Sequence, residues 1–132
     1  MNRFVIVLIG LAVCLLPATA FAGAKERFLS ELQLAVSRQD TNWLGAHADY
    51  PVAIRGKRRV VIKSRSNFAM WDPNQLLTPE LQADILAEKP DDLFVNWQGM
   101  MIGSGERNIW VRDISPDPSR PDYRIFAIDI GR

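Results

Sequence analysis

The chain is organised around one stretch, Asp92-Leu-Phe-Val-Asn-Trp-Gln-Gly-Met-Met-Ile-Gly-Ser-Gly-Glu-Arg-Asn-Ile-Trp-Val-Arg-Asp-Ile114. It is rich in β-branched and aromatic residues on both sides of a glycine turn, which is typical of a β-hairpin. We predict a long strand over about 93–102, a turn at Gly103-Ser104-Gly105 and a second strand over about 108–114. Glycines suit this turn because they adopt positive φ angles without steric cost. Gly99, in the middle of the first strand, predicts a bulge or a sharp bend.

The N-terminus has the layout of a secretory signal. Arg3 precedes a thirteen-residue apolar run over 4–16, and Pro17 and small residues follow it. The pattern Ala20-Phe-Ala22 predicts cleavage after Ala22, with cleavage after Ala20 as an alternative. The apolar run is shorter than the ~20 residues that span a bilayer, so we expect removal and not anchoring. We therefore expect a signal peptide over 1–22 and a periplasmic or secreted protein that has no membrane attachment after cleavage.

Cysteine content and charge exclude several classes of function. The only cysteine, Cys14, lies in the predicted signal, so the mature chain offers no thiol for catalysis, for a disulfide or for a metal site. Residues 23–132 contain fifteen basic and fifteen acidic residues, because Arg3 is the one charged residue that leaves with the signal. A neutral domain is a poor general binder of nucleic acid or of an anionic membrane.

The segment before the hairpin predicts mainly helices. Apolar residues recur at helical spacing over 24–39, which predicts an amphipathic first helix. Asp40 and Thr41 can cap a short second helix, which must end before Pro51. Gly56-Lys57 predicts a turn between two short strands. After a helical turn capped by Ser64 or Ser66, Thr78-Pro79 is a start signal for a helix that we expect to run to Lys89.

A loop with three prolines, over 115–121, precedes a last predicted strand at 123–130. Strict alternation would place Arg124, Phe126, Ile128 and Ile130 on one face of this strand, and Tyr123, Ile125, Ala127 and Asp129 on the other. Helices gathered before a bent sheet predict one α+β domain over 23–132, in which N-terminal helices pack on a strongly curved, cone-like antiparallel sheet. Apolar residues on both faces of strand 93–102 indicate that both are partly covered, with a pocket at the mouth of the cone.

This order of elements, with the bend expected at Gly99, resembles the cone-shaped α+β superfamily named after nuclear transport factor two, to which ketosteroid isomerase and scytalone dehydratase belong. Small bacterial exported proteins of that superfamily are similar to this chain at Tyr50-Pro51, Gly56-Lys57, Ile62-Lys63-Ser64 and Phe94-Val-Asn-Trp-Gln-Gly-Met-Met-Ile-Gly-Ser-Gly. The resemblance implies the fold and export. It implies no reaction, because the superfamily contains enzymes, binding modules and assembly scaffolds alike.

Two sets of polar residues are candidates for catalysis. His47, Asp49 and Tyr50 resemble an acid–base cluster of the dehydratase branch, since mixed His, Asp and Tyr sites suit proton abstraction beside a carbonyl. They are crowded within four positions, so we expect His47 to be a surface or capping residue and Tyr50 to pack on the core. An isomerase would need a carboxylate base with an oxyanion hole, for which the chain offers Asp113, Tyr123 and Asp129 outside any matching motif. We assign no catalytic residue, and a lone histidine indicates neither a metal nor a cofactor.

Two further sets are candidates for binding. A small apolar ligand in the cone would contact aromatic, sulfur and amide side chains, which are Tyr50, Asn96, Trp97, Gln98, Met100 and Trp110. Filling of the core and of its rim is the alternative role for these residues. The segment 55–65 holds six basic residues and no acidic one, and it could bind an acidic envelope protein or polymer through Arg55, Lys57, Arg58 and Arg59. No aromatic residue interleaves with these bases, so we expect no nucleic acid.

The sequence predicts an exported, non-catalytic binding protein. Its partner would be a small apolar ligand in the cone or a protein on the sheet, and a second copy could form a homodimer. One alternative is a cofactor-free isomerase, dehydratase or hydrolase that uses a pocket Asp. Another is an inhibitor or immunity-type protein that acts through the basic hairpin 55–65. Buried carboxylates would favour an enzyme, an empty apolar cone would favour ligand storage, and a filled cone with a protruding basic hairpin would favour a partner protein.

Overall fold

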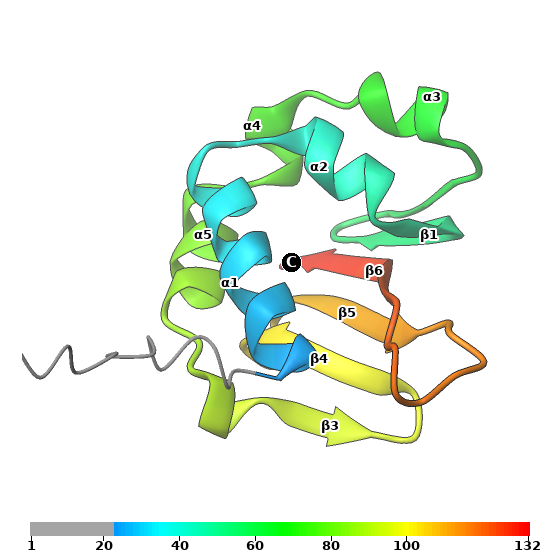
Figure 1. Ribbon diagram of the computed structural model, residues 1–132. Helices are drawn as coiled ribbons and strands as arrows, with labels where there is room; N and C mark the ends of the chain where they lie inside the picture. The colour runs from blue at the N-terminus through cyan, green and yellow to red at the C-terminus, as the bar shows by residue number, and fades with distance from the viewer. Residues whose placement is uncertain (1–22) are drawn as a thin grey trace, which may run out of the picture.

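The structure is a computed structural model that describes residues 23–132, so the predicted signal over 1–22 lies outside the described residues. Helices cover one six-stranded sheet (Figure 1). The helical elements are α1 (Ala24–Ser37), α2 (Thr41–Ala46), α3 (Arg65–Ala69), α4 (Pro73–Leu76), α5 (Pro79–Leu86) and the 3₁₀ turn η2 (Pro90–Asp92). The strands are β1 (Ala48–Arg55), β2 (Arg59–Ile62), β3 (Phe94–Asn96), β4 (Gly99–Gly103), β5 (Arg107–Asp113) and β6 (Tyr123–Ile130).

The strand order is β2-β1-β6-β5-β4-β3. Neighbouring strands are antiparallel except β1 and β6, which run parallel. The sheet is therefore mixed and open. The predicted α+β class is confirmed, whereas the prediction of a purely antiparallel sheet is wrong. The physical reason is that β6, the last strand in the sequence, pairs in parallel with β1, the first. Local turn signals carry no information on a pairing between strands so far apart in the sequence.

The central stretch contains one more reversal than its sequence predicts. The strand predicted over 93–102 is two strands, β3 and β4, joined by a turn at Trp97-Gln98. The Asn96 side-chain oxygen accepts hydrogen bonds from the backbone N–H groups of Gln98 (2.8 Å) and Gly99 (3.3 Å), and these bonds hold the turn. Gly99 has a φ of 145°, which favours glycine, so it marks the reversal and not a bend within one strand. The turn at 103–105 and the strand after it are confirmed.

The predicted helix starts are confirmed by their caps. Side-chain oxygens of Asp40, Ser64 and Thr78 accept hydrogen bonds from backbone N–H groups in the first turns of α2, α3 and α5. Such bonds satisfy donors that the helix itself leaves unpaired. The last of these helices ends at Leu86, earlier than the expected end at Lys89.

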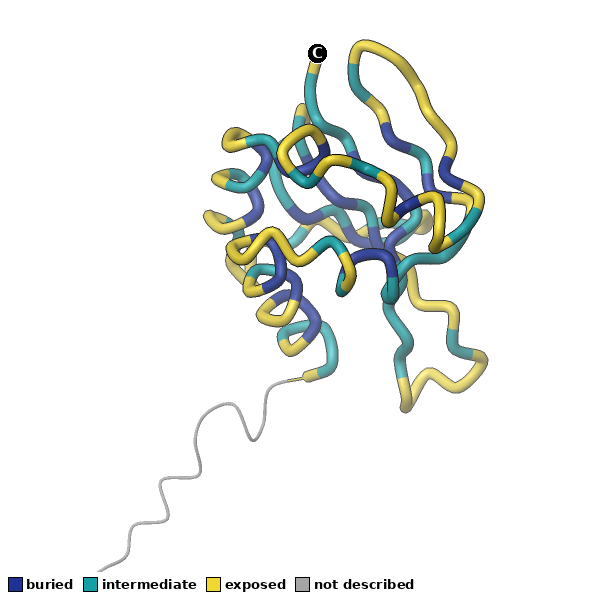
Figure 2. Tube along the Cα trace, turned by 90° about the horizontal axis from the view of Figure 1, so that it is seen from above, coloured by how far each residue is buried: buried dark blue, intermediate teal, exposed yellow. Residues whose placement is uncertain are grey.

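The core fills the space between the helices and one face of the sheet. Its helical side chains include Leu32 on α1 and Leu81 on α5, and both are fully buried. The sheet contributes residues of every strand except β3, among them Ile54, Ile102, Ile109, Val111 and Ile128. Figure 2 shows these buried segments facing one another between the helices and the strands.

A bulge in β6 overturns the strict alternation predicted for this strand. Trp110 of β5 pairs with Ala127 and Val111 pairs with Ile125, so Phe126 is an extra residue opposite β5. The extra residue changes the side to which the following residues point. As a result, Ile125 and Ile128 both lie in the core, although the sequence pattern places them on opposite faces.

Candidate functional site

The sheet carries a continuous row of apolar residues on the face opposite the core. One residue of each strand takes part, and the strand pairings place the six in register: Val61, Ala53, Ala127, Trp110, Met101 and Phe94. We call this set the outer row. None of the six belongs to the core cluster or to the partly buried residues that pack against it. Val61 and Phe94 at its two ends are exposed, Ala53, Trp110 and Met101 are partly exposed, and Ala127 is buried. Apart from Ala127, the outer row is therefore an apolar surface that the described helices leave open.

Aromatic side chains cluster in the part of the outer row that crosses β3 to β6. Phe94 meets Trp110 edge to face with ring centroids 6.3 Å apart, and Phe126 lies 6.2 Å from Trp110 on the other side. The Arg112 guanidinium lies over the Phe126 ring at 4.7 Å and forms an ion pair with Asp49 at 2.8 Å. Aromatic rings and arginine are the side chains that are most enriched at the energetic centres of protein interfaces.

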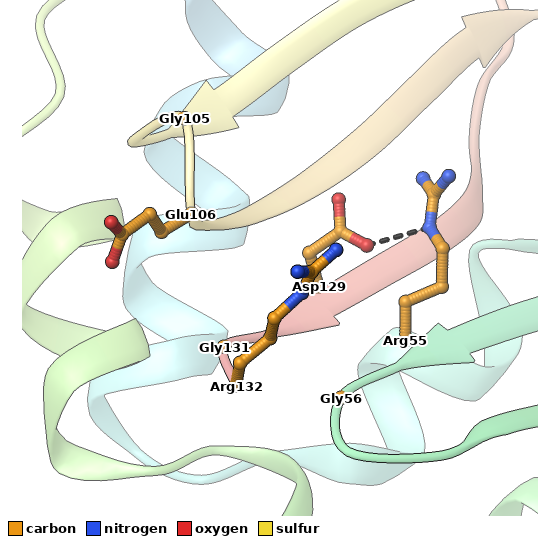
Figure 3. Close-up of a pocket in the computed structure, with 7 residues that line it drawn as sticks. All are labelled: Arg55, Gly56, Gly105, Glu106, Asp129, Gly131 and Arg132. Carbon is orange, nitrogen blue, oxygen red and sulfur yellow. Dashed lines mark ion pairs between the residues drawn. The ribbon is translucent and has the colours of Figure 1, made fainter.

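A second row of five residues, four of them polar, borders the outer row on the same face, two positions along each strand. Its members are Arg59, Arg55, Asp129, Asn108 and Gly103, which are paired in register across β2, β1, β6, β5 and β4. We call this set the polar row. The Arg55 Nε atom and an Asp129 carboxylate oxygen form an ion pair at 2.6 Å, shown as the dashed line in Figure 3. Partial burial raises the pKa of Asp129 above its ordinary value, and Arg55 opposes part of this rise.

A hollow of about 670 Å³ opens at the polar row. Glycines leave room for it, and the charged groups come from three separate parts of the chain (Figure 3). The lining residues are Arg55, Gly56, Gly105, Glu106, Asp129, Gly131 and Arg132. Arg55 contacts Asp129 through Nε, and its two terminal nitrogens point away from that carboxylate (Figure 3), in a position to bind a carboxylate or an amide oxygen of another molecule. The hollow is therefore suited to polar groups and not to an apolar ligand.

Asn108 contributes a buried acceptor to the polar row. Its Nδ2 atom donates a hydrogen bond to the Ser104 carbonyl oxygen at 2.7 Å. Its Oδ1 atom has no hydrogen-bond partner within residues 23–132, although the residue is almost completely buried. A buried acceptor without a partner is costly, so it marks a place where another donor would stabilise the structure.

The structure does not bring the six predicted ligand-binding residues to one cavity. Met100 points into the core, and Trp110 lies on the opposite face of the sheet. The Tyr50 hydroxyl donates a hydrogen bond to the Gly45 carbonyl oxygen at 2.6 Å, and its ring packs against the core as predicted. Asn96, Trp97 and Gln98 form the β3–β4 turn, where Trp97 is 90% exposed. A ligand site built from this set stays a prediction.

The catalytic candidates have separate partners. His47 is the C-cap residue of α2: its Nδ1 atom lies 2.8 Å from the Trp43 carbonyl oxygen, and its ring stacks on Trp43. Its predicted capping role is thus confirmed. Asp49 pairs with Arg112, and the exposed Asp113 accepts hydrogen bonds from the backbone N–H groups of Ser115, which begins the proline-rich loop, and of Asp122, which follows it. These contacts hold neighbouring segments of the chain in place. They do not test a catalytic role for these residues, so an enzyme stays an alternative and no catalytic residue is assigned.

The predicted basic partner site is divided between two surroundings. Arg55 forms an ion pair with Asp129 and Arg59 lies beside Arg55 in the polar row, whereas Lys57 and Arg58 are exposed in the turn of the β1–β2 hairpin. The sequence pattern missed Asp129 as the ion-pair partner of Arg55, Glu106 as a residue of the same hollow, and Asn108 as the neighbour of Asp129 in the polar row. No local signal could have found them, because only the pairing of β1 with β6 and of β6 with β5 brings them together.

Comparisons with known proteins do not extend this description. No protein-family model matches the chain, and no curated protein or solved structure matches it either. In the described part of the chain, no helix has both the length and the apolar character needed to cross a membrane. Within residues 23–132, His, Asp and Glu side chains nowhere gather in a group of three that could hold a metal ion.

Proposed function

We propose that the protein is exported and binds a partner protein on the open face of its sheet. The observation that carries the proposal is the outer row, in which all six strands contribute an apolar residue to a face that the described helices do not cover. Large apolar patches on the surface of a protein commonly mark interaction sites. The polar row beside it would fix the orientation of the partner through Arg55 and Asp129.

The filled interior supports a protein partner over a small apolar ligand. Leu32, Leu81, Ile102 and Ile109 are fully buried between the helices and the sheet. The 670 Å³ hollow is lined by charged residues and glycines, whereas sites for small ligands are lined mainly by apolar side chains. By the criteria set out from the sequence, a filled interior and a basic hairpin with exposed cations favour binding of a protein.

The proposal includes the finer features of the fold and of export. The bulge in β6 supports a curved, cone-like sheet of the superfamily named after nuclear transport factor two, because bulges bend and twist a sheet. The bend expected at Gly99 gives no such support, since Gly99 follows a reversal between two strands. Removal of residues 1–22 fits the A-x-A pattern at Ala20-Phe-Ala22. N-terminal sequencing of the exported protein should begin at Gly23, or at Phe21 for the alternative site, and a sequence that begins at Met1 would contradict export with cleavage.

The partner can be located by crosslinking in cells that express the protein. A photo-crosslinking amino acid at Met101, between Trp110 and Phe94 in the outer row, should give a discrete product, because a docked partner covers that position. The same amino acid at Ser30, exposed on α1, is the matched control and should give none. A product with twice the mass of the chain identifies a second copy, and any other mass identifies a different protein. The absence of a product specific to Met101 would contradict docking on this face.

A further inference from the structure

The sheet has two open edges, and their chemistry is complementary. Strands β2 and β3 stand at the two ends of the strand order. An edge strand leaves alternate backbone N–H and C=O groups unpaired, and these groups can accept a further strand from another chain. Natural sheets protect such edges with charged residues, proline or bulges. Here the centres of both edges are apolar instead.

Each edge exposes one apolar side chain toward each face of the sheet. On β2, Val61 belongs to the outer row and is 45% exposed, whereas Val60 is 38% exposed and pairs with the core residue Ile54. On β3, Phe94 belongs to the outer row and is 51% exposed, whereas Val95 is 57% exposed and pairs with the core residue Met100. If one edge joined the other, the apolar surface would continue across the junction on both faces.

A groove beside β2 offers room for the incoming strand. It has a volume of about 520 Å³ and lies between β2 and the helices α3 and α4. Its lining residues are Val60, Val61, Ile62, Asn67, Met70, Trp71, Asp72 and Gln75. Met70 is among the most exposed large apolar residues of the described chain, and its side chain would be covered by an apolar residue entering this groove. A strand added to β2 would direct alternate side chains into the groove.

Charge decides which edges can meet. The segment 55–65, which contains β2, holds six basic residues and no acidic one. Exposed Asp91 and Asp92 lie immediately before β3 in η2. Two β2 edges would bring like charges together, and so would two β3 edges, which is unfavourable. Only the pairing of β2 with β3 joins opposite charges.

We propose that the protein associates with itself head to tail, with the β2 edge of one copy added to the β3 edge of the next. The contact is heterologous, so the copy at each end of an assembly keeps one free edge and chains of copies can grow. Both strands are short, and we therefore expect a weak, rapidly exchanging contact that depends on concentration. This association uses the edges of the sheet and is independent of the proposed binding on its open face.

Sedimentation velocity of the purified exported protein tests the proposal with two charge-swap variants. The wild-type protein should sediment faster as its concentration rises, and added salt should weaken this effect because it screens the charges. Arg58→Glu with Arg59→Glu, and separately Asp91→Lys with Asp92→Lys, should each remain monomeric, because like charges then meet at the contact. An equimolar mixture of the two variants should associate again, since each edge then finds an opposite charge on the other variant.

The controls separate this contact from other forms of association. Lys25→Glu with Arg38→Glu changes the net charge by the same amount as the β2 swap, but in the first turn of α1 and at its C-cap, and this variant should associate like the wild type. Circular dichroism of every variant establishes that it is folded. A wild-type protein that stays monomeric at all concentrations would overturn the proposal. Association that survives both edge swaps but is lost on Met101→Asp would also overturn it, because the contact would then use the open face.

Discussion

The two faces of the sheet are nearly equal in apolar content and differ in what covers them. On the covered face, Val60, Ile54, Ile128, Ile109 and Ile102 are paired in register across five strands, and we call this set the inner row. The outer row crosses all six strands on the opposite face. Four of the five inner-row residues are buried beneath the helices, whereas only Ala127 of the outer row is buried.

This difference shows that apolar content does not by itself identify the core of a sheet protein. The inner row consists of aliphatic β-branched residues, which pack densely against helices. The outer row contains the larger, more polarisable side chains of Phe94, Met101 and Trp110, which are enriched at interfaces that form and dissociate. The covered face therefore stabilises the fold, and the open face is available for binding. Each prediction below tests one part of this comparison.

The largest expected effect comes from a pair of adjacent methionines, one on each face. Met100 is 3% exposed in the core, whereas Met101 belongs to the outer row. We expect Met100→Ala to lower the free energy of unfolding by about 2–5 kcal/mol, because it removes buried contacts and leaves a cavity. Met101→Ala should cost less than about 1 kcal/mol, as is usual for surface substitutions. Urea unfolding of both variants measures the difference.

The two methionines are a matched pair, because the residue type, the substitution and the strand are the same. Equal losses of stability would contradict the comparison, since they would show that the outer row is covered in the protein as purified. A loss for Met101→Ala that grows with protein concentration would assign the cover to a second copy of the chain.

A smaller effect is expected at the turn that adds β3 to the sheet and so completes the outer row at Phe94. Gly99 has a positive φ, and a Cβ atom there would collide with the Val111 carbonyl oxygen. We expect Gly99→Ala to cost about 1–3 kcal/mol in urea unfolding, the typical cost of such backbone strain. Gly105→Ala is the control, because nothing lies within 4 Å of the added methyl group. A Gly99→Ala variant as stable as the control would show that β3 contributes little to the sheet.

Local signals predict local structure well in this chain, and the limits of the prediction have a physical cause. Caps at Asp40, Ser64 and Thr78 and the turn at 103–105 follow from side-chain and backbone chemistry within four residues, and all are confirmed. The turn at Trp97-Gln98 was missed because its flanks are β-prone on both sides and only Gly99 marks it. From the sequence, Gly99 predicts a bulge or a sharp bend within one strand and not a reversal between two strands.

The candidate site was less predictable because it depends on contacts between distant segments. The outer and polar rows exist only through the pairing of β1 with β6, which joins residues more than seventy positions apart, such as Arg55 and Asp129. The bulge at Phe126 also moves residues between the faces, so period-two alternation gives the wrong partners for β6. Trp110 was predicted as a binding residue from its type, but its face could not be assigned without the register.

The smallest expected effect is a change in the free energy of unfolding with pH that arises from Asp129 in the polar row. The prediction concerns the direction of that change. Burial raises the pKa of Asp129 and the ion pair with Arg55 lowers it, and the first effect is the larger. The folded chain therefore holds this proton to a higher pH than the unfolded chain does, whose value is close to the ordinary 3.8. The pKa of Asp129 in the unfolded chain and its raised pKa in the folded chain bound a pH window that begins near 3.8. As pH rises through this window, the free energy of unfolding decreases, and above the window the decrease stays constant.

The Asp129→Asn variant cannot titrate at this position, and its amide oxygen can still accept a hydrogen bond from Arg55. We therefore expect the wild type to lose stability relative to this variant as pH rises through that window, measured by urea unfolding at a series of pH values. The opposite trend, a wild type that loses relative stability as pH falls, would show that the ion pair dominates. In that case water would reach the Asp129 carboxylate in the polar row, and burial would not raise its pKa. The expected trend instead requires that the folded chain itself shields Asp129 from water, so that a partner bound at the hollow would enlarge the effect.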